Sequence, residues 1–506
     1  MDRRRFTLAA LVLSVPLFLS FPSAVHAQVS WGPDTRLTFA PGWKYDPIVA
    51  TSGDTVYVVW WDKRRFGGEG DIYFRRSVDG GLTWDPEIRL DSDTIPYADE
   101  PTIAVRAPFV HVAWYDFRDG RDVRIRYCRS TDAGITWSRD TALAGFAEQC
   151  YHPALACGDN RDVFLTYVQS DSPTSRVGTW LRKSTDEGLT WGRDTLILPL
   201  TYYQFPNALC YRLGMLHLIR EGNTFGSTTW EILYRRSSDQ GVSWAPDVPL
   251  SSLDSIVSQW PRITAGKDSI VHVVWADGKY SPIGWTSDIF YRRSTDRGLT
   301  WEAIRETLTT LHRALSSDVA VNSSLVHVVW DDQRSGKFAI YYRESLDKGL
   351  TWLPEVLLST GSQDSHLPTV ATTNGKVHVA WYDSRDDTTK SEIYYKRGVI
   401  VTGVSEQGSM IGQRPGEITL NASPNPFRKG VFIQVFLPGP HKFKLTFYDI
   451  LGREIKVLPC EAFGAGAFWA HWNGKDYSGR PVPPGVYFLR LEVQGFSVVQ
   501  KLVKAR

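Results

Sequence analysis

Carboxylates at three positions could act as the acid and the base of a glycosidic cleavage. Asp99 and Glu100 are neighbours in the sequence, and Glu221 lies in an atypical stretch of a later segment. A glycoside hydrolase needs two carboxyl groups at one bond, one to donate a proton and one to act as base or nucleophile. The sequence does not give the separation of these groups. They are candidates for catalysis, and a role as simple ligand contacts stays open.

A charged motif, Trp-x-Asp-x-Arg, recurs along much of the chain. Copies stand at Trp114, Asp116 and Arg118, at Trp330, Asp332 and Arg334, and at Trp381, Asp383 and Arg385, while Trp275 and Asp277 lack the Arg and Trp61-Asp62-Lys63-Arg64 has the acid one position early. One interpretation is a single Asp–Arg pair in each repeat that holds a turn. The other is a ring of Asp and Arg that binds acidic or polyhydroxy ligands through charge-assisted hydrogen bonds.

Two segments break this motif, and a unique site could lie where the symmetry is lost. The third has Tyr167, Gln169, Asp171 and Arg176 at this place, and the fourth has Arg220 and Glu221. Sequence drift explains the change equally well.

The residues just before the Pro-initiated run of each repeat vary. They are Tyr45 and Asp46, Asp99 and Glu100, Tyr151 and His152, Gln204 and Phe205, Gln259 and Trp260, and His366. Aromatic rings stack on sugars and carboxylates accept hydroxyl hydrogen bonds, so this mixture is typical of glycan binding. Arg262 and Asp318, at equivalent positions of neighbouring repeats, either line the same central channel or pair with each other.

Four histidines share one register, Val-His-Val, with one in each of four repeats: His111, His272, His327 and His378. Widely spaced repeats cannot bring them to one ion, so we predict no metal site and no cofactor. The sequence also contains no Gly-rich phosphate loop and no hydrolase nucleophile elbow.

A repeat of about 53 residues must position all these side chains. Its clearest part is Ser-x-Asp-x-Gly-x-Thr-Trp, which ends at Trp84, Trp137, Trp191, Trp244, Trp301 and Trp352, with spacings of 53, 54, 53, 57 and 51 residues. A Pro-initiated run, a β-branched run ending in Trp and a Tyr- and Arg-rich run precede it, and a run ending in Leu follows. Four short strands in each such repeat are typical of a β-propeller blade.

The number of repeats sets the predicted fold. The first-strand segment occurs seven times, and the seventh repeat stops at IYYKR from Ile393 without its Trp-containing box. VSWGPDTRL from Val29 supplies the missing Trp and fourth strand, because Trp31 lies 53 residues before Trp84. We therefore predict an all-β chain with a seven-bladed propeller over residues 28–397, closed by its N-terminal strand. Six blades are the alternative.

The Asp of each box is predicted to be structural. Asp accepts hydrogen bonds from backbone N–H groups in a turn, Gly permits a positive φ, and Trp buries a large ring between sheets. Because each copy stands in the same setting far from the next, no two converge on a ligand. These residues are Asp79, Asp132, Asp186, Asp239, Asp296 and Asp347.

The box closely resembles the Asp-box, or bacterial neuraminidase repeat, of sialidase-like propellers. The resemblance implies a propeller with its boxes on the face away from the active site, and it is weak as a marker of function. A sialidase would further need an Arg-Ile-Pro motif, three arginines, a Tyr–Glu pair and an acid/base Asp. The chain has only Pro261-Arg262-Ile263, in the wrong order, and its seven predicted blades exceed the six of sialidases. Both departures count against sialidase activity.

The C-terminal segment is different in composition. Residues 398–416 read as a linker, and residues 417–506 hold short alternating strands typical of a small β-sandwich. The string from Trp469, WAHWNGKDYSGRPVPPGVYF, resembles the Ig-like C-terminal sorting domain of the type IX secretion system and the Ig-like domain of hook-capping proteins. The resemblance implies the outer-membrane secretion and sorting machinery as a partner. A passive spacer domain is the alternative.

The first 27 residues resemble a secretory signal, with Arg3 to Arg5, an apolar run and small residues at Val25 and Ala27. Without them the chain holds 54 Lys and Arg against 54 Asp and Glu, so a nucleic-acid partner is not predicted. We expect an exported monomer, secreted or at the outer cell surface. It binds glycan or another surface polymer; the alternatives are a glycoside hydrolase and a non-catalytic interaction module.

The cysteines do not form a disulfide framework, because there are five of them and they are scattered. Cys157 and Cys210 fall at equivalent repeat positions and could approach each other, but buried free thiols are the preferred prediction.

Overall fold

The β-branched runs of the repeat form extended strands because branched and aromatic side chains fit a pleated, buried surface. A computed structural model describes residues 27–65, 70–92, 97–118, 122–144, 149–171, 176–201, 204–223, 229–254, 256–280, 287–303, 307–309, 313–373, 375–387, 389–402, 419–428, 430–437, 442–450, 452–461, 466–493 and 496–505. Residues 1–26 of the predicted signal 1–27 lie outside this set, and so do residues 403–418, which include most of the predicted linker 398–416. The chain divides into two units, residues 1–404 and 405–506.

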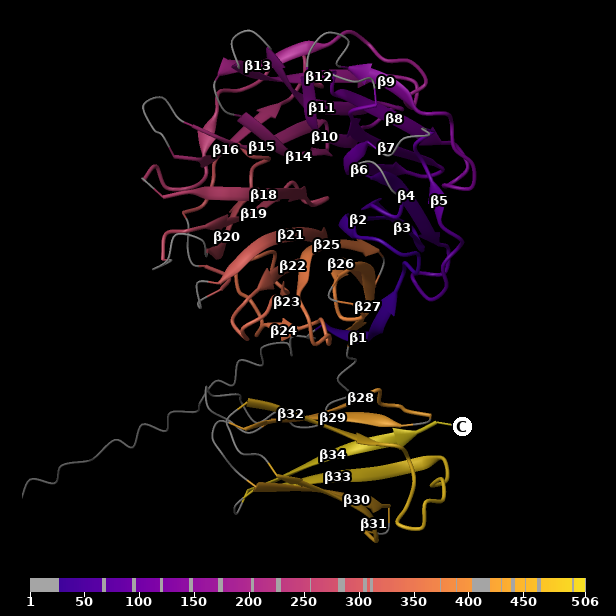
Figure 1. Cartoon of the computed structure of the whole chain (residues 1–506). Coiled ribbons are helices and arrows are strands. Elements are labelled where there is room, and N and C mark those ends of the chain that lie inside the picture. The colour runs from indigo at the N-terminus through magenta and orange to yellow at the C-terminus, as the bar shows by residue number, and fades with distance from the viewer. Residues whose placement is uncertain are drawn as a thin grey trace, which may run out of the picture. The chain divides into compact units, whose positions relative to one another are not determined.

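Antiparallel sheets form the framework of the first unit in its described residues, and Figure 1 shows them arranged around a common centre. Sheet 1 holds β2 (Lys44–Ser52), β3 (Thr55–Asp62), β4 (Asp71–Ser77) and β5 (Ile88–Arg89). Sheet 2 holds β6 (Ala98–Arg106), β7 (Phe109–Asp116), β8 (Arg124–Ser130) and β9 (Thr141–Ala144). Sheet 3 holds β10 (Gln149–Cys157), β11 (Val163–Asp171), β12 (Arg176–Ser184) and β13 (Thr195–Thr201).

The later repeats form the remaining sheets of this unit. Sheet 4 holds β14 (Gln204–Arg212), β15 (Met215–Gly222), β16 (Glu231–Ser237) and β17 (Val248–Pro249), and sheet 5 holds β18 (Ser258–Ala265), β19 (Val271–Asp277) and β20 (Asp288–Ser294). Sheet 6 holds β21 (Ala314–Asn322), β22 (Leu325–Asp332), β23 (Ala339–Ser345) and β24 (Val356–Leu357). Sheet 7 holds β25 (Ser365–Thr373), β26 (Lys376–Asp383), β27 (Glu392–Thr402) and β1 (Ala27–Arg36).

The first strands of the sheets contact one another in chain order, and β25 contacts β2, so the sheets form a closed ring. The all-β propeller fold expected from the repeats is therefore confirmed. Each first strand also carries an irregularity near its start, for example between Tyr45 and Ile48 in β2 and between Asp99 and Thr102 in β6. A bulge of this kind turns a side chain away from the regular alternation.

Sheet 7 is completed by the N-terminal strand, as the sequence predicts. β1 pairs with β27 from Ala27 opposite Thr402 to Arg36 opposite Tyr394. β27 thus runs to Thr402, past residue 397, where the repeat was expected to end, because its last residues pair with β1.

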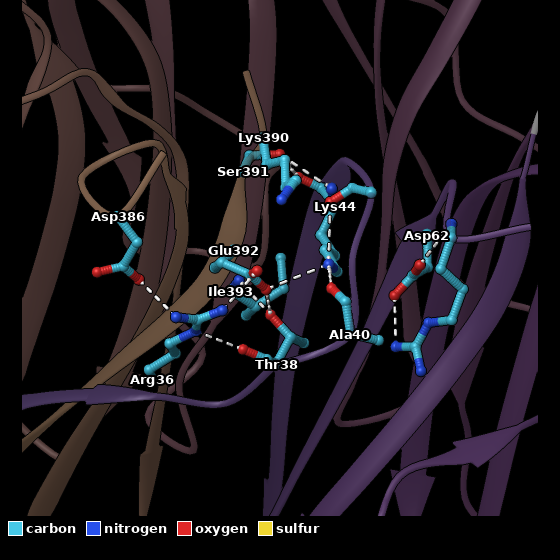
Figure 2. A network of polar contacts seen from close by, with 12 residues as sticks. Arg36, Thr38, Ala40, Lys44, Asp62, Asp386, Lys390, Ser391, Glu392 and Ile393 are labelled. Atoms are coloured by element: carbon cyan, nitrogen blue, oxygen red, sulfur yellow. Dashed lines mark hydrogen bonds and ion pairs between the residues drawn. The ribbon is translucent and has the colours of Figure 1, made fainter. Parts of the chain in front are cut away.

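A buried polar cluster joins sheets 7 and 1 next to this strand (Figure 2). The Lys44 ammonium is fully buried and lies 3.3 Å from the Glu392 carboxylate, and it also donates to the Ala40 carbonyl. Glu392 accepts from Arg36 and from the Thr38 hydroxyl, both at 2.6 Å. Burying an ammonium without a counter-charge costs free energy, and the Glu392 carboxylate neutralises the charge of Lys44. This cluster therefore fixes the junction between the first and the last sheet.

Each box Trp packs on the third strand of the preceding sheet. Five such Trp–Tyr pairs meet edge-on, with ring centroids 4.8–5.1 Å apart. They are Trp31 with Tyr342, Trp84 with Tyr395, Trp191 with Tyr127, Trp301 with Tyr234 and Trp352 with Tyr291. Each of these Tyr hydroxyls is 2.6–2.7 Å from a His Nδ1 of the adjacent second strand, on His327, His378, His111, His217 and His272. Each of these five contacts between neighbouring sheets thus uses one Trp, one Tyr and one His.

At the two remaining junctions between sheets, both the Tyr and the His are replaced by other residues. Where the His position holds Tyr57, the next strand has Phe74, which meets Trp137 at 4.8 Å. Where it holds Phe164, the next strand has Leu181, which lies in the same apolar cluster as Trp244. The third strand thus has Tyr at the five junctions where the second strand has His, and Phe74 or Leu181 at the other two.

The box turns have the geometry expected of a structural element. In the first copy Asp79 accepts from the Thr83 backbone at 2.9 Å and from its hydroxyl at 2.6 Å, and it also accepts from the Ser77 hydroxyl at 2.7 Å. The same bonds recur at Asp132, Asp186, Asp239, Asp296 and Asp347. These bonds lower the pKa of the Asp79 carboxyl and hold that of Asp132 at about 2.

The cysteines described in the structure are free thiols: Cys128, Cys150, Cys157 and Cys210. Cys157 and Cys210 therefore do not form the disulfide that their repeat positions made conceivable. Cys460 lies in a part whose side chains are not described.

The second unit is a sandwich of two antiparallel sheets. One holds β28 (Thr419–Ser423), β29 (Val431–Leu437) and β32 (Gly466–Trp472), and the other holds β31 (Glu454–Glu461), β30 (Lys442–Asp449), β33 (Gly485–Val493) and β34 (Phe496–Lys504). Trp472 of the first sheet lies 4.2 Å from Phe447 of the second between ring centroids, in a core shared by both. No membrane-spanning helix occurs in the described parts of the chain.

The packing of the box glycine on Tyr predicts a selective defect. Gly298 has φ +77°, and a Cβ there would overlap the Tyr234 hydroxyl. Gly336 has φ +89°, but a Cβ would meet nothing within 4 Å. We expect G336A to cost about 1 kcal/mol from backbone strain alone, and G298A to cost roughly 1–3 kcal/mol more from overpacking. Denaturant unfolding of both variants measures this, and equal losses would contradict the Gly–Tyr contact.

Candidate functional site

One residue of the bulge in each of five first strands has a left-handed backbone although it is not glycine. These residues are Asp46, Glu100, His152, Trp260 and Leu367, with φ between 44° and 53°. Such a conformation costs of order 1 kcal/mol and persists where the surroundings impose it. The strained position is thus a repeated feature of the ring, and its side chains differ in every sheet. We call the bulge residues and the side chains that contact them the central rim.

The rim is acidic along sheets 1 to 3. Glu100 Oε2 lies 2.6 Å from His152 Nδ1, so the bulge residues of sheets 2 and 3 are joined. Asp99 accepts from the Tyr115 hydroxyl at 3.1 Å and from the Glu100 backbone at 2.7 Å. Asp46 holds the equivalent position in sheet 1, and three titratable side chains therefore follow one another around the ring.

The pKa values show that these carboxyl groups act on one another. Burial, with the like charges of Asp99 and Glu100, raises the pKa of Asp46 to about 7, although the positive charge of Arg262 opposes the rise. Burial and the charge of Glu100 raise the pKa of Asp99 to about 6. Arg262 belongs to sheet 5, which is not a neighbour of sheet 1.

Aromatic rings flank the carboxylates on both sides. Tyr45 lies 5.2 Å from Trp61 and 5.1 Å from Tyr382 between ring centroids. Across the acidic part, Tyr115 lies 5.5 Å from Tyr151. Trp260 is 40% exposed, which leaves its ring open to solvent. Flat apolar faces beside hydrogen-bond acceptors match the two surfaces of a sugar ring.

Glu221, a catalytic candidate from the sequence, has a structural task instead. The side chain is buried, and it accepts a hydrogen bond of 2.6 Å from the Trp260 backbone N–H of the next sheet. Asp331 makes the equivalent bond to Leu367 at 3.2 Å. Asp318 accepts from the Val370 backbone at 2.8 Å, with Arg262 nearby acting to lower its raised pKa. These carboxylates tie neighbouring sheets together, so Asp46, Asp99 and Glu100 remain as the groups able to meet a ligand.

The Asp–Arg pairs lie inside the turns of their own sheets. Each Arg is ion-paired with the Asp of its own motif, at 2.6 Å or less, and with a second acid near the outer strand. In three sheets the guanidinium also lies over a Tyr ring. The sets are Arg64 with Asp62 and Glu87, Arg118 with Asp116 and Asp140, Arg334 with Asp332 and Glu355, and Arg385 with Asp383 and Asp34. The turn-holding interpretation is favoured over the ligand-binding one for these residues, because each guanidinium is already paired with two acids.

The structure corrects the alignment of the first copy. Trp60, not Trp61, is fully buried, and its indole donates to Asp62 at 3.0 Å. The motif therefore reads Trp60-x-Asp62-x-Arg64, with no shift. In sheet 4 Arg220 takes the place of this Trp; it is buried and paired with Asp247 at 2.6 Å, so it belongs to the framework and not to the rim.

The register histidines serve the core. Each bonds a Tyr hydroxyl, as described above, and burial lowers the pKa of His111 to about 3 and that of His272 to about 4. No cluster of three or more metal-ligating side chains was found among the described residues. Of the irregular third repeat, Tyr167 is buried, whereas the side chains of Asp171 and Arg176 lie outside the described set, as do those of Gln204 and Phe205.

Two cavities lie away from the rim, on the box side. One of about 280 Å³ is lined by Tyr234, Arg236, Asp247 and Leu299, and an equivalent one of about 230 Å³ is lined by Phe74, Arg76, Asp85 and Ile135. Both fall below the ~300–1,000 Å³ of typical ligand pockets. Arg76 is ion-paired with Asp85 and Asp247 with Arg235, while Arg236 donates to the Arg297 carbonyl. We therefore interpret both cavities as packing gaps of the repeat.

Three rim aromatics were missed from the sequence: Trp61, Tyr115 and Tyr382. They occupy the x of Trp-x-Asp, the position that pairs across the sheet with Tyr45, Asp99 and His366. The sequence does contain a signal for this position. The residue between Trp and Asp varies from copy to copy, whereas the Trp and the Asp on either side of it are kept in these copies.

Comparisons with solved structures place the first unit among known folds. An ulvan lyase of polysaccharide lyase family PL25 is similar over 71% of this chain and 94% of its own, with 12% identity and a TM-score of 0.51. A sialidase of Trypanosoma rangeli matches 94% of this chain and 89% of its own at 12% identity and a TM-score of 0.44, and a protein of unknown function from Dyadobacter fermentans matches 60% and 95% at 16% identity and 0.46. No family model and no curated protein matches the chain. The shared feature is the propeller fold.

The raised pKa of Asp46 predicts how stability depends on pH. Its carboxyl is protonated in the folded chain up to about pH 7, but in the unfolded chain only up to about pH 4. The folded state therefore gains stability as pH falls from 7 to 4, and at higher pH the buried charge costs free energy. We expect D46N to be about 1–2 kcal/mol more stable than the parent at pH 8, with the difference vanishing near pH 4.

Asn also tolerates the left-handed backbone of this residue, so the comparison isolates the charge. The matched control is D54N, since Asp54 is exposed and ion-paired with Lys376, which lowers its pKa. Denaturant unfolding at pH 5, 6, 7 and 8 gives the curves. A D46N variant less stable than the parent at pH 8 would contradict the charge repulsion at the rim.

Proposed function

We propose that the chain binds a glycan at the central rim. The observation that carries this proposal is the contact of Glu100 with His152, which joins the bulge residues of two consecutive sheets beside the Tyr115 and Tyr151 rings of the same rim. Carboxylates and an imidazole accept and donate hydrogen bonds to sugar hydroxyls, while the rings offer faces for stacking. The fold shared with the ulvan lyase, whose structure holds -[GlcA(1-4)Rha3S]-, supports a glycan-related role in coarse terms.

Glycoside hydrolysis is a second candidate, and one observation favours it. Burial, with the like charges of Asp99 and Glu100, raises the pKa of Asp46 to about 7, and a general acid needs a pKa near the working pH. Asp99, with a pKa of about 6, would be its partner. Sialidase chemistry is less favoured, because a sialate carboxylate needs several arginines and Arg262 is the arginine that acts on the described rim.

The location of this activity is part of the proposal. The signal-like residues 1–27 and the resemblance of residues 417–506 to a sorting domain support export to the cell surface or beyond. The two-sheet sandwich of the second unit is compatible with that role. We propose the outer-membrane secretion machinery as the partner of this unit.

A glycan array tests binding and cleavage together. The purified chain is applied to neutral, amino-containing and acidic glycans, and both retention and loss of terminal sugars are scored. We expect retention without loss, weakened at least tenfold by W260N, which removes the open ring but keeps a residue that tolerates positive φ. Y477A is the control, because Tyr477 is a 56% exposed ring in the second unit.

Loss of a terminal sugar that D46N abolishes would replace binding by hydrolysis as the function. Retention by no glycan, or retention unaffected by W260N and D46N in variants with parental melting temperatures, would overturn a glycan site at the rim.

A further inference from the structure

The two units of the chain carry opposite net charges, although the chain without its predicted signal is neutral. Residues 28–404 contain 41 Lys and Arg against 47 Asp and Glu, a net charge of −6. Residues 405–506, the second unit, contain 13 Lys and Arg against 7 Asp and Glu, a net charge of +6. A charge asymmetry of this kind between two parts of a chain indicates a charged partner, and here the cationic part is the second unit.

The four-stranded sheet of the second unit has one face that its core does not use. Phe447 of β30 and Leu489 of β33 belong to the core shared with the other sheet. Successive side chains of a strand alternate between its two faces, so the residues next to these lie on the opposite face. We call this the outer face, and its side chains include Lys444, Tyr448, Phe488, Arg490, Val499 and Lys501.

Apolar side chains make up part of the outer face. Tyr448 of β30 pairs across the sheet with Phe488 of β33, and Phe488 pairs with Lys501 of β34. Val499, in the adjacent row of the same face, is 57% exposed, while Tyr448 and Phe488 are half-buried. The open face of an antiparallel sheet is normally polar, because it meets water. An exposed Val beside two aromatic rings departs from that pattern.

The charged groups of the outer face are positive in sum. Arg490 is ion-paired with Glu492 at 3.1 Å, so these two charges offset each other. Lys444 and Lys501 are exposed, and neither ammonium has an ion-pair partner among the described residues. They stand on β30 and β34, with β33 between them. Two cations thus lie on either side of the strand that carries Phe488.

A partner of this face must meet cations and apolar groups at once. A hydrated acidic polysaccharide offers negative charge, but it would leave Val499 and the aromatic rings without an apolar contact. The surface of an anionic bilayer offers both. Its headgroup phosphates attract Lys and Arg, and the boundary of its acyl chains accepts apolar and aromatic side chains.

We propose that the outer face of the second unit binds an anionic lipid surface. Lys444 and Lys501 meet the headgroup phosphates, and Val499 and the Phe488 ring lie at the boundary of the acyl chains. The contact is peripheral, and it does not depend on a glycan site at the rim. It gives the second unit a task of its own, which is to hold the propeller next to a membrane.

Vesicle sedimentation tests this proposal with the chain from residue 28 onward, which lacks the apolar run of the predicted signal. One set of vesicles is phosphatidylcholine alone, and the other contains an equal amount of phosphatidylglycerol. At about 50 mM salt we expect binding to the phosphatidylglycerol vesicles to be about tenfold tighter or more. Raising the salt to about 300 mM should remove most of this difference, because screening weakens the attraction between the cations and the phosphates.

Two variants with the same change of net charge separate the outer face from the charge of the whole unit. K444E/K501E should lose about tenfold or more of the affinity for phosphatidylglycerol vesicles. K475E/R480E alters two exposed residues of the connection between β32 and β33, and it should keep most of the affinity. V499S changes only apolar area and should weaken binding roughly threefold at both salt concentrations. Each variant is compared at parental melting temperature.

Each contrary outcome would overturn the lipid contact. Binding to neither kind of vesicle, equal binding to both, or equal losses in the two charge variants would do so. Retention on polygalacturonate that K444E/K501E abolishes, without vesicle binding, would make an acidic polymer the partner instead. A salt-sensitive dimer that K444E/K501E abolishes, again without vesicle binding, would mean that a second copy covers the outer face.

Discussion

The contact between a box Trp and a Tyr of the preceding sheet is the interaction on which the rest of the structure depends. A sheet with two apolar faces is stable only when both are covered. This contact covers one face at five junctions, and Phe74 or Leu181 takes the place of the Tyr at the other two. The Tyr hydroxyl is buried, so it needs the His beside it, and the box Gly must leave room for that hydroxyl. The Tyr ring thereby fixes the relative positions of three strands: its own, the strand that carries the His and the segment that carries the box.

The constraint also explains where variation is allowed. Residues on the faces between sheets repeat, because each must fit the same neighbour. The bulge at the start of each first strand points out of that packing, and its side chains are free to differ: Asp46, Glu100 and His152 on one side, Trp260 and Leu367 on the other. A framework that repeats seven times thus carries a site that does not repeat, made from positions the packing does not use.

The sequence predicted the fold more fully than the site. Regular spacing of Trp84 and its counterparts identified the repeat, and Trp31 identified the strand that closes the ring, because packing positions recur with the period of the fold. The rim was found in part. Asp46, Asp99 and Glu100 were placed at the start of the first strands, where they lie. Glu221 and Arg220 belong to the framework instead, and Trp61, Tyr115 and Tyr382 were not recognised as rim residues. Whether a charged side chain faces a ligand or a neighbouring backbone N–H depends on the distances between sheets. The amino-acid sequence does not give these distances.

Closure by β1 has a consequence for how the molecule forms. The strand at residues 27–36 pairs with residues 394–402, so its partner is the last part of the ring to be made. Until then the first strand has no ladder to join and the buried Lys44 has no Glu392. An emerging chain can assemble its sheets one after another, but the final junction waits for the most distant pairing in the sequence, with the high contact order that makes such a step slow. β1 therefore stays an unpaired strand throughout the synthesis of the ring and is covered only when β27 is complete.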